Sequence, residues 1–144
     1  MSQAERSTAV LRFFGDDLDP DEVSALLGCN PTSAVRKGDI LTMGSTGRTR
    51  IAKTGRWSLN AADCGPEDIE SQVFAILGGL TGDMDVWRSL SKRFEADLFC
   101  GVFMGSGNDG LVLSPKALLA LGQRGIALEL DIYDSVEDES AQAG

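Results

Sequence analysis

Histidine is absent from this 144-residue sequence. It is the commonest general base and metal ligand at neutral pH, so its absence excludes Ser-His-Asp and Cys-His catalysis within this chain and any zinc site that uses histidine. Catalysis by carboxylates or lysine alone stays open, but the composition favours a protein without enzymatic activity. The spacings of an EF-hand, a P-loop and a dinucleotide-binding fold are also missing, and we therefore expect no metal and no cofactor.

Cysteine is scarce as well. Cys29, Cys64 and Cys100 lie far apart in the sequence, whereas metal-binding cysteines usually come in close pairs and a disulfide framework needs an even number. We expect three buried free thiols, because unpaired cysteine behaves as a small apolar residue in protein cores.

Long hydrophobic runs are lacking too. No apolar stretch approaches the roughly 20 residues that cross a bilayer, and the first residues, MSQAERST, lack the basic start and apolar middle of a signal peptide. The sequence therefore predicts a cytoplasmic protein that does not enter a membrane.

The length of the chain suits one domain. We expect a disordered N-terminus over residues 1–8, one domain over residues 9–134 and a disordered acidic tail over residues 135–144.

The net charge of the chain is −9, which argues against general affinity for nucleic acid or for anionic membranes. This charge is unevenly distributed, because the segment 36–56 carries a net charge of +5 and the remainder carries −14. The cations of this basic segment are Arg36, Lys37, Arg48, Arg50, Lys53 and Arg56. The sequence thus predicts one cationic region in an otherwise acidic protein.

Hydrophobic periodicity predicts elements in the order β-α-β-β-α-α-β-α-β. Asp19 and Pro20 are typical of a helix start and Gly28 of a helix end; Ser114 and Pro115 begin a second helix in the same way. These elements predict an α+β fold, in which a mostly antiparallel mixed sheet carries helices packed on one face. A ferredoxin-like arrangement would use β-α-β-β-α-β and leave one α-β unit added at the end.

The basic segment and the tryptophan that follows it supply the candidate ligand-binding residues, which are Arg36, Lys37, Arg48, Arg50 and Trp57. Backbone amides of the glycine-rich stretch 43–50 could cradle a phosphate with help from its two arginines. A hairpin connection explains the same glycines without a ligand. The tryptophan beside the cations could stack on a base or bind an acidic peptide, whereas balanced surface charge is the simpler alternative.

A second candidate is the acidic strand near the C-terminus. Glu129 and Asp131 alternate with apolar residues and precede Tyr133. Two carboxylates on one strand face could bind a metal or act as an acid/base pair. Solvation of the polar face of an amphipathic strand explains them without any function and is the favoured interpretation.

Several stretches together resemble a bacterial family, the one catalogued as domain of unknown function 4279. They are LRFFGDDLDPDEVSALLGCNPTSAVRKGD, the later GRWSLNA, and LLALGQRGIALELDIYD near the end. The resemblance spans about residues 9–134. Its most recognisable parts are the exit from the first helix at Pro-Thr, the Lys-Gly-Asp triplet and the closing Asp-Ile-Tyr. The resemblance implies no reaction, cofactor or catalytic residue.

Three functional hypotheses follow from these observations. The leading one is a non-catalytic binding or interaction protein, in a specific form an acidic immunity-type partner that covers a cationic toxin. The rival is a sensor or enzyme that binds a phosphorylated small molecule through the basic segment 36–56. A structural or assembly subunit is the third, and the sequence leaves the oligomeric state open.

Overall fold

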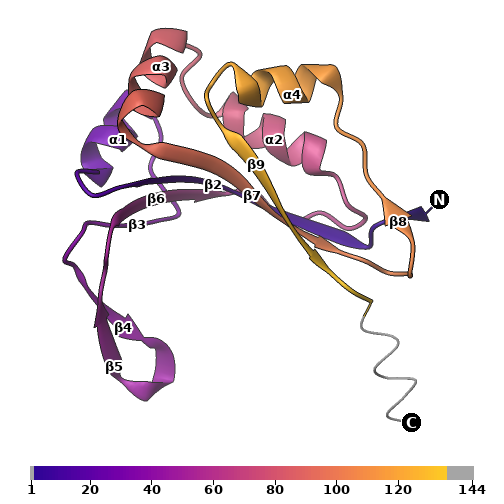
Figure 1. Ribbon diagram of the computed structural model, residues 1–144, viewed down its shortest axis with the longest axis horizontal. Helices are drawn as coiled ribbons and strands as arrows, with labels where there is room; N and C mark the ends of the chain where they lie inside the picture. The colour runs from indigo at the N-terminus through magenta and orange to yellow at the C-terminus, as the bar shows by residue number, and fades with distance from the viewer. Residues whose placement is uncertain (1, 136–144) are drawn as a thin grey trace.

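The computed structural model of the chain describes residues 2–135, and its centre is a five-stranded sheet (Figure 1). The strand order across this sheet is β3-β6-β2-β7-β9. The strands are β2 (Arg6–Gly15), β3 (Ser33–Val35), β6 (Gly55–Asn60), β7 (Glu95–Phe103) and β9 (Ala127–Tyr133). All neighbouring pairs are antiparallel except β7 and β9, which are parallel.

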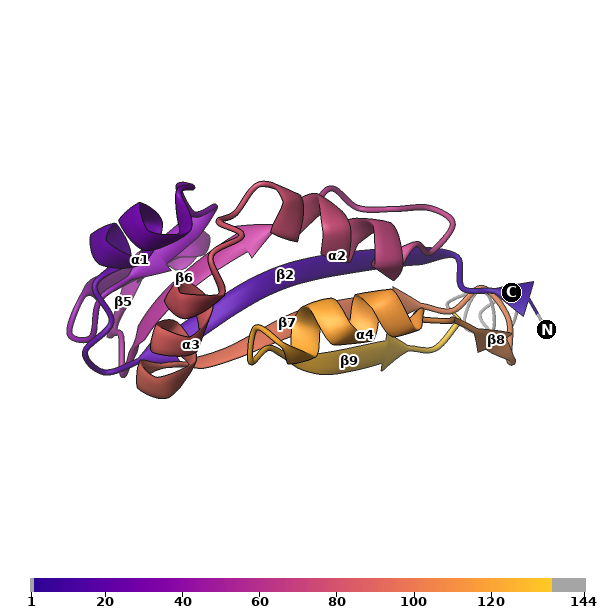
Figure 2. The ribbon, with the colours of Figure 1, turned by 90° about the horizontal axis from the view of Figure 1, so that it is seen from above.

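The helices of the described residues lie together over one face of this sheet (Figure 2). They are α1 (Pro20–Leu27), α2 (Ile69–Gly78), α3 (Met84–Arg93) and α4 (Pro115–Gly122). Asp19 and Ser114 cap α1 and α4 by accepting hydrogen bonds from backbone amides of the first turn, and a proline follows each cap. The predicted helix starts are therefore confirmed, as is the α+β fold with helices on one face.

The connections confirm the ferredoxin-like arrangement. The strands and helices β2-α1-β3-β6-α2-α3-β7 give a four-stranded antiparallel sheet, in which β2 lies between β6 and β7 and β3 lies at the edge. The added α-β unit is α4 followed by β9, which pairs beside β7. This addition makes β9 an edge of the sheet.

Strand alternation divides the side chains between a core face and an open face. Leu11 and Phe13 of β2 point toward the helices and are buried, whereas Arg12 and Phe14 point to the open face. Trp57 of β6 lies opposite Phe13 and belongs to the core, with 0% exposure. Its indole N–H donates to the hydroxyl of Ser24 in α1 at 3.0 Å.

A separate two-stranded hairpin is inserted between β3 and β6. It consists of β4 (Ile40–Met43) and β5 (Arg48–Ile51), joined by a short 3-10 turn over Gly44–Thr46. Gly47 follows in a left-handed conformation, with φ of 69°, which glycine adopts without strain. Figure 1 shows the hairpin extending from the side of the sheet away from the helices. The predicted hairpin connection at 43–50 is therefore confirmed.

The N-terminal boundary differs from the prediction of a disordered segment over residues 1–8. β1 (Ser2–Gln3) pairs in parallel with β8 (Asp109–Gly110), Ala4 is buried, and β2 already begins at Arg6. Contacts with distant residues hold this segment, among them the hydrogen bond from the Ser2 hydroxyl to the carboxylate of Asp109 and the backbone hydrogen bond from the amide of Glu5 to the carbonyl of Phe103. The predicted tail over 135–144 lies, apart from its first residue, outside the described residues.

The cysteines of the chain are free thiols, as predicted, but they are buried to different degrees. Cys100 is fully buried in β7, and this burial raises the pKa of its thiol to about 12. Cys29 and Cys64 are half-buried. Within residues 2–135, no group of carboxylates and thiols is arranged to hold a metal ion, and no helix is long and apolar enough to cross a membrane.

The close contact between β2 and β6 predicts that Gly55→Ala will be destabilising. An added Cβ would lie 2.7 Å from the carbonyl oxygen of Gly15 and 3.0 Å from Cβ of Leu18, so the backbone would have to shift. We expect a loss of about 1–3 kcal/mol in the free energy of unfolding, measured by urea denaturation. Gly82→Ala is the matched control, because nothing lies within 4 Å of its added Cβ. Equal stability of the two variants would contradict this packing.

The N-terminal strand should depend on the charge of Asp109. Hydrogen bonds from Ser106, Ser2 and backbone amides lower the pKa of this carboxyl to about 2. Its contribution is therefore complete above the unfolded-state pKa of about 3.9 and is lost as pH falls through about 2. We expect Asp109→Asn to accelerate hydrogen exchange of residues 2–5 at neutral pH. Asp85→Asn, on the surface of α3, should leave that exchange unchanged.

Candidate functional site

The open face of the sheet is organised in rows that cross the strands. One row contains Val35 of β3, Arg56 of β6, Phe14 of β2 and Glu95 of β7, because these residues are direct neighbours in the strand register. Each of them alternates with a residue whose side chain faces the helices. The row therefore places an arginine between two apolar side chains at the end of the sheet where the hairpin leaves it.

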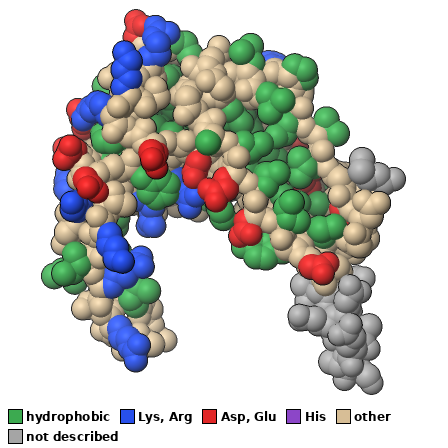
Figure 3. Space-filling model, in the orientation of Figure 1, with side chains coloured by type: hydrophobic (Ala, Val, Ile, Leu, Met, Phe, Trp, Pro, Cys, Tyr) green, Lys and Arg blue, Asp and Glu red, His purple; other side chains and the backbone are tan. Residues whose placement is uncertain are grey.

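The hairpin and this row enclose a pocket of about 240 Å³. Phe14, Val35 and Arg56 come from the sheet, and Leu41 and Arg50 lie directly opposite each other on the hairpin. The remaining lining residues, Ile51, Ala52, Lys53 and Thr54, belong to the end of β5 and the connection into β6. Figure 3 shows the molecule hollowed beside the hairpin on this side. We call this pocket the basic cleft.

The cations of the basic cleft differ from most others in the protein. Arg50, Lys53 and Arg56 form no ion pair with any carboxylate of residues 2–135. In addition, Nε of Arg56 is buried and has no hydrogen-bond partner among the described residues. A buried donor without a partner costs free energy, which an acceptor on a ligand would recover.

Arg12, on the neighbouring strand β2, differs from Arg56 because it is paired with two carboxylates. Its guanidinium donates two hydrogen bonds to Asp97, both at 2.8 Å, and one to Glu129 at 3.2 Å. The hydrogen bonds to Asp97 raise the pKa of Arg12. The same guanidinium lies over the rings of Phe14 and Phe99, 5.0 and 4.4 Å from their centroids. Arg12 therefore holds the ring that forms one wall of the basic cleft.

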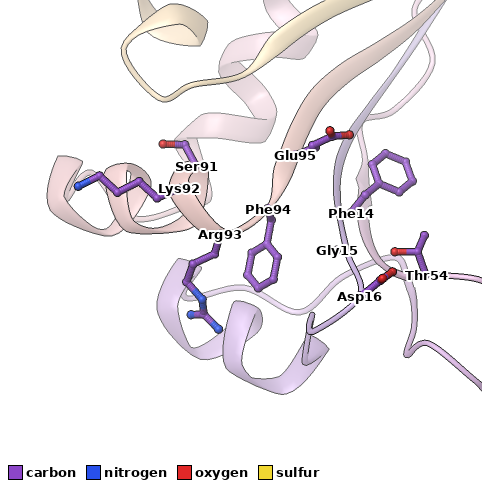
Figure 4. Close-up of a pocket in the computed structure, with 9 residues that line it drawn as sticks. All are labelled: Phe14, Gly15, Asp16, Thr54, Ser91, Lys92, Arg93, Phe94 and Glu95. Atoms are coloured by element: carbon purple, nitrogen blue, oxygen red, sulfur yellow. The ribbon is translucent and has the colours of Figure 1, made fainter.

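A second, wider pocket of about 650 Å³ adjoins the basic cleft and shares Phe14 and Thr54 with it (Figure 4). Two of its four ionic groups are paired with neighbours, and the other two, Lys92 and Glu95, carry opposite charges. Arg93 binds Glu22 of α1 at 2.7 Å, and hydrogen bonds from Thr54 and from Lys37 lower the pKa of the Asp16 carboxyl. This pocket consequently offers less uncompensated charge to a ligand than the basic cleft.

The structure separates the five site residues predicted from the sequence. Arg50 lines the basic cleft, whereas Arg48 lies at the exposed start of β5. Trp57 is a core residue, so it cannot stack on a ligand at the surface. Arg36 and Lys37 precede the hairpin and are drawn toward α1.

Acidic residues around the start of α1 account for the position of those two cations. Arg36 donates to Asp19 at 2.7 Å and to Asp21 at 3.2 Å, and Lys37 donates to Asp16 at 3.3 Å. The hydrogen bond from Arg36 lowers the pKa of Asp19. These cations attach the base of the hairpin to α1 and do not join the basic cleft.

Lys53 and Arg56 were absent from the predicted set, although both belong to the basic segment. Strand alternation around Trp57 could have indicated the position of Arg56, since a buried tryptophan places its neighbours on the opposite face. The closure of the cleft by the hairpin has no comparable signal, because it depends on how the hairpin lies beside the sheet.

The acidic strand β9 belongs to no cluster of carboxylates or thiols that could hold a metal ion within residues 2–135. Glu129 serves as a partner of Arg12, and Asp131 accepts a hydrogen bond from the hydroxyl of Tyr133 at 2.6 Å. That hydrogen bond raises the pKa of Tyr133. The Tyr133 ring also stacks on Phe103, with 4.7 Å between centroids.

The fold and the cleft together define a ferredoxin-like α+β domain with an added α-β unit and an inserted hairpin. A scan against known protein families matches residues 5–135 with the family described as Domain of unknown function (DUF4279). The chain belongs to this family, which confirms the resemblance seen in the sequence. Searches of curated proteins and of solved structures gave no match.

The contrast between two arginines of the open face gives a testable difference in stability. Arg56→Met keeps an apolar side chain and removes the unpartnered Nε, so we expect the free energy of unfolding to rise by about 1 kcal/mol. Arg12→Met removes the partner of Asp97 and should lower it by about 1–3 kcal/mol. Urea denaturation of both variants measures the difference. Destabilisation by both would show that Arg56 has a structural role.

Proposed function

We propose that the protein is a binding protein that captures a small phosphorylated molecule in the basic cleft. One observation carries this proposal: three cations without carboxylate partners among residues 2–135 converge on one pocket of a chain whose net charge is −9. Uncompensated like charges repel one another, and an anion between them relieves that repulsion. Most of the other arginines are already paired within the described structure.

The chemistry of the lining favours phosphate as the anionic group. The guanidinium groups of Arg50 and Arg56 can each donate two parallel hydrogen bonds to phosphate oxygens, and Lys53 adds a point charge. Phe14 and Leu41 offer apolar surface to the remainder of the molecule. The volume of about 240 Å³ is just below the roughly 300–1,000 Å³ typical of ligand pockets, which favours a small ligand.

The lining also favours binding over catalysis. The described residues of the cleft supply hydrogen-bond donors, a threonine hydroxyl and apolar contacts, without a carboxylate that could serve as general base.

The proposed function is the alternative predicted from the sequence, but its site contains Lys53 and Arg56 in place of Arg36 and Lys37. The immunity-type role stays a prediction, which no contact among the described residues favours.

Calorimetric titration of the purified protein with nucleoside monophosphates and sugar phosphates tests the proposal. We expect saturable binding by at least one of these compounds. Lys53→Gln and Arg56→Gln should each weaken it by about tenfold to a hundredfold, because each removes a charged donor.

Two exposed cations outside the cleft provide matched controls. Lys116→Gln, on α4, and Arg48→Gln, at the start of β5, remove the same charge and should leave the affinity unchanged. Binding that falls equally in all four variants would reflect general electrostatic attraction, and the proposal would be wrong. Absence of binding by every compound would also overturn it.

A further inference from the structure

The hairpin and the β9 edge of the five-stranded sheet carry opposite charge, and each has a strand edge without a partner among residues 2–135. The hairpin of β4 and β5 presents Arg48 and Arg50, and on the opposite side β9 presents Glu129 and Asp131. Figure 3 shows cationic side chains on the hairpin and acidic ones along the lower border of the sheet toward β9. A chain with these two sides is complementary to a second copy of itself.

Strand β5 of the hairpin has one edge without a partner strand among residues 2–135. Arg48 and Arg50 share one face with the residues directly opposite them on β4, and Ile51 shares the other face with Ile40. Both isoleucines are largely exposed, 65% for Ile51 and 73% for Ile40. Among residues 2–135, β5 pairs with β4 alone, so its other edge has free backbone donors and acceptors.

Strand β9 has the matching character at the opposite edge of the sheet. Glu129 and Asp131 lie on the open face, and Leu130 and Ile132 lie on the other face with exposures of 38% and 58%. Its outer edge pairs with no other strand of the described residues. Edge strands usually carry charged side chains or proline against unwanted pairing, and β9 carries only the two carboxylates of its open face, without lysine or proline.

We propose that β5 of one copy pairs with β9 of a second copy. The two arginines of β5 and the two carboxylates of β9 are each two residues apart and lie on one face of their strand, so they meet as two opposite-charge pairs. Arg50 is then shared between this contact and the basic cleft, whereas Arg48 serves the contact alone. Ile51 then joins the aliphatic row of Leu130 and Ile132 on the other face. A two-fold axis closes the assembly with two equivalent contacts.

Charge complementarity favours the pairing of β5 with β9 over the pairing of either strand with its own copy. Antiparallel pairing of β9 with β9 would bring the carboxylates of Glu129 and Asp131 together, and like charges directly opposite each other are destabilising. Pairing of β5 with β5 would oppose arginines in the same way. The combination of β5 with β9 matches both charge and apolar character.

Light scattering after size-exclusion chromatography, over a range of concentrations, tests this assembly. We expect the wild-type chain to form dimers. A variant with Arg48→Glu and Arg50→Glu should dissociate about a hundredfold more readily, and so should a variant with Glu129→Lys and Asp131→Lys. Mixing these two variants should restore dimers, because the reversed hairpin of one matches the reversed edge of the other.

Controls separate this result from misfolding and from the basic cleft. Circular dichroism establishes that each variant is folded, and Asp131→Lys alone retains the pair between Arg12 and Glu129. Arg48→Glu alone alters the hairpin outside the cleft lining and should weaken the dimer without changing ligand affinity. A wild-type monomer at every concentration would overturn the proposal, as would a dimer that neither charge reversal weakens or a mixture that stays monomeric.

Discussion

Within residues 2–135, helices cover one face of the sheet, and the side chains of the other face have to be stabilised by one another and by water. Arg12 at the centre of that face meets this constraint through its two hydrogen bonds to Asp97 and its position over Phe14 and Phe99. Arg56, one strand away, has no ionic partner among these residues. Its positive charge therefore stays uncompensated beside the basic cleft.

Much of the fold could be predicted because its signals are local. Asp19 with Pro20 and Ser114 with Pro115 determine helix starts through hydrogen bonds within one turn, and strand alternation gave the buried faces. The order of elements then favoured the ferredoxin-like arrangement. The ordered N-terminus was missed because Ser2 of β1 is held by Asp109, more than a hundred positions away, and such a contact leaves no periodic pattern.

The candidate site was less predictable, for a related reason. The sequence indicated the basic segment, but ion pairs with carboxylates around the start of α1 neutralise Arg36 and Lys37, whereas Lys53 and Arg56 have no such partner among the described residues. These pairs depend on where α1 lies relative to the base of the hairpin. The prediction for Trp57 was wrong because α1 packs over β6 and makes this tryptophan part of the core. Strand alternation then places its neighbour Arg56 on the opposite face.

The central position of β2 has a consequence for how the chain folds. This strand is nearly the first segment of the domain, yet it pairs with β7 in a register that joins Arg6 to Phe103. Loop closure over such a span is entropically costly and slows folding relative to local contacts. During synthesis, β2 can pair with β6 early, but its other edge stays open until β7 has left the ribosome. The unit of α4 and β9 can be added only after that, so the acidic edge is the last part of the sheet to form.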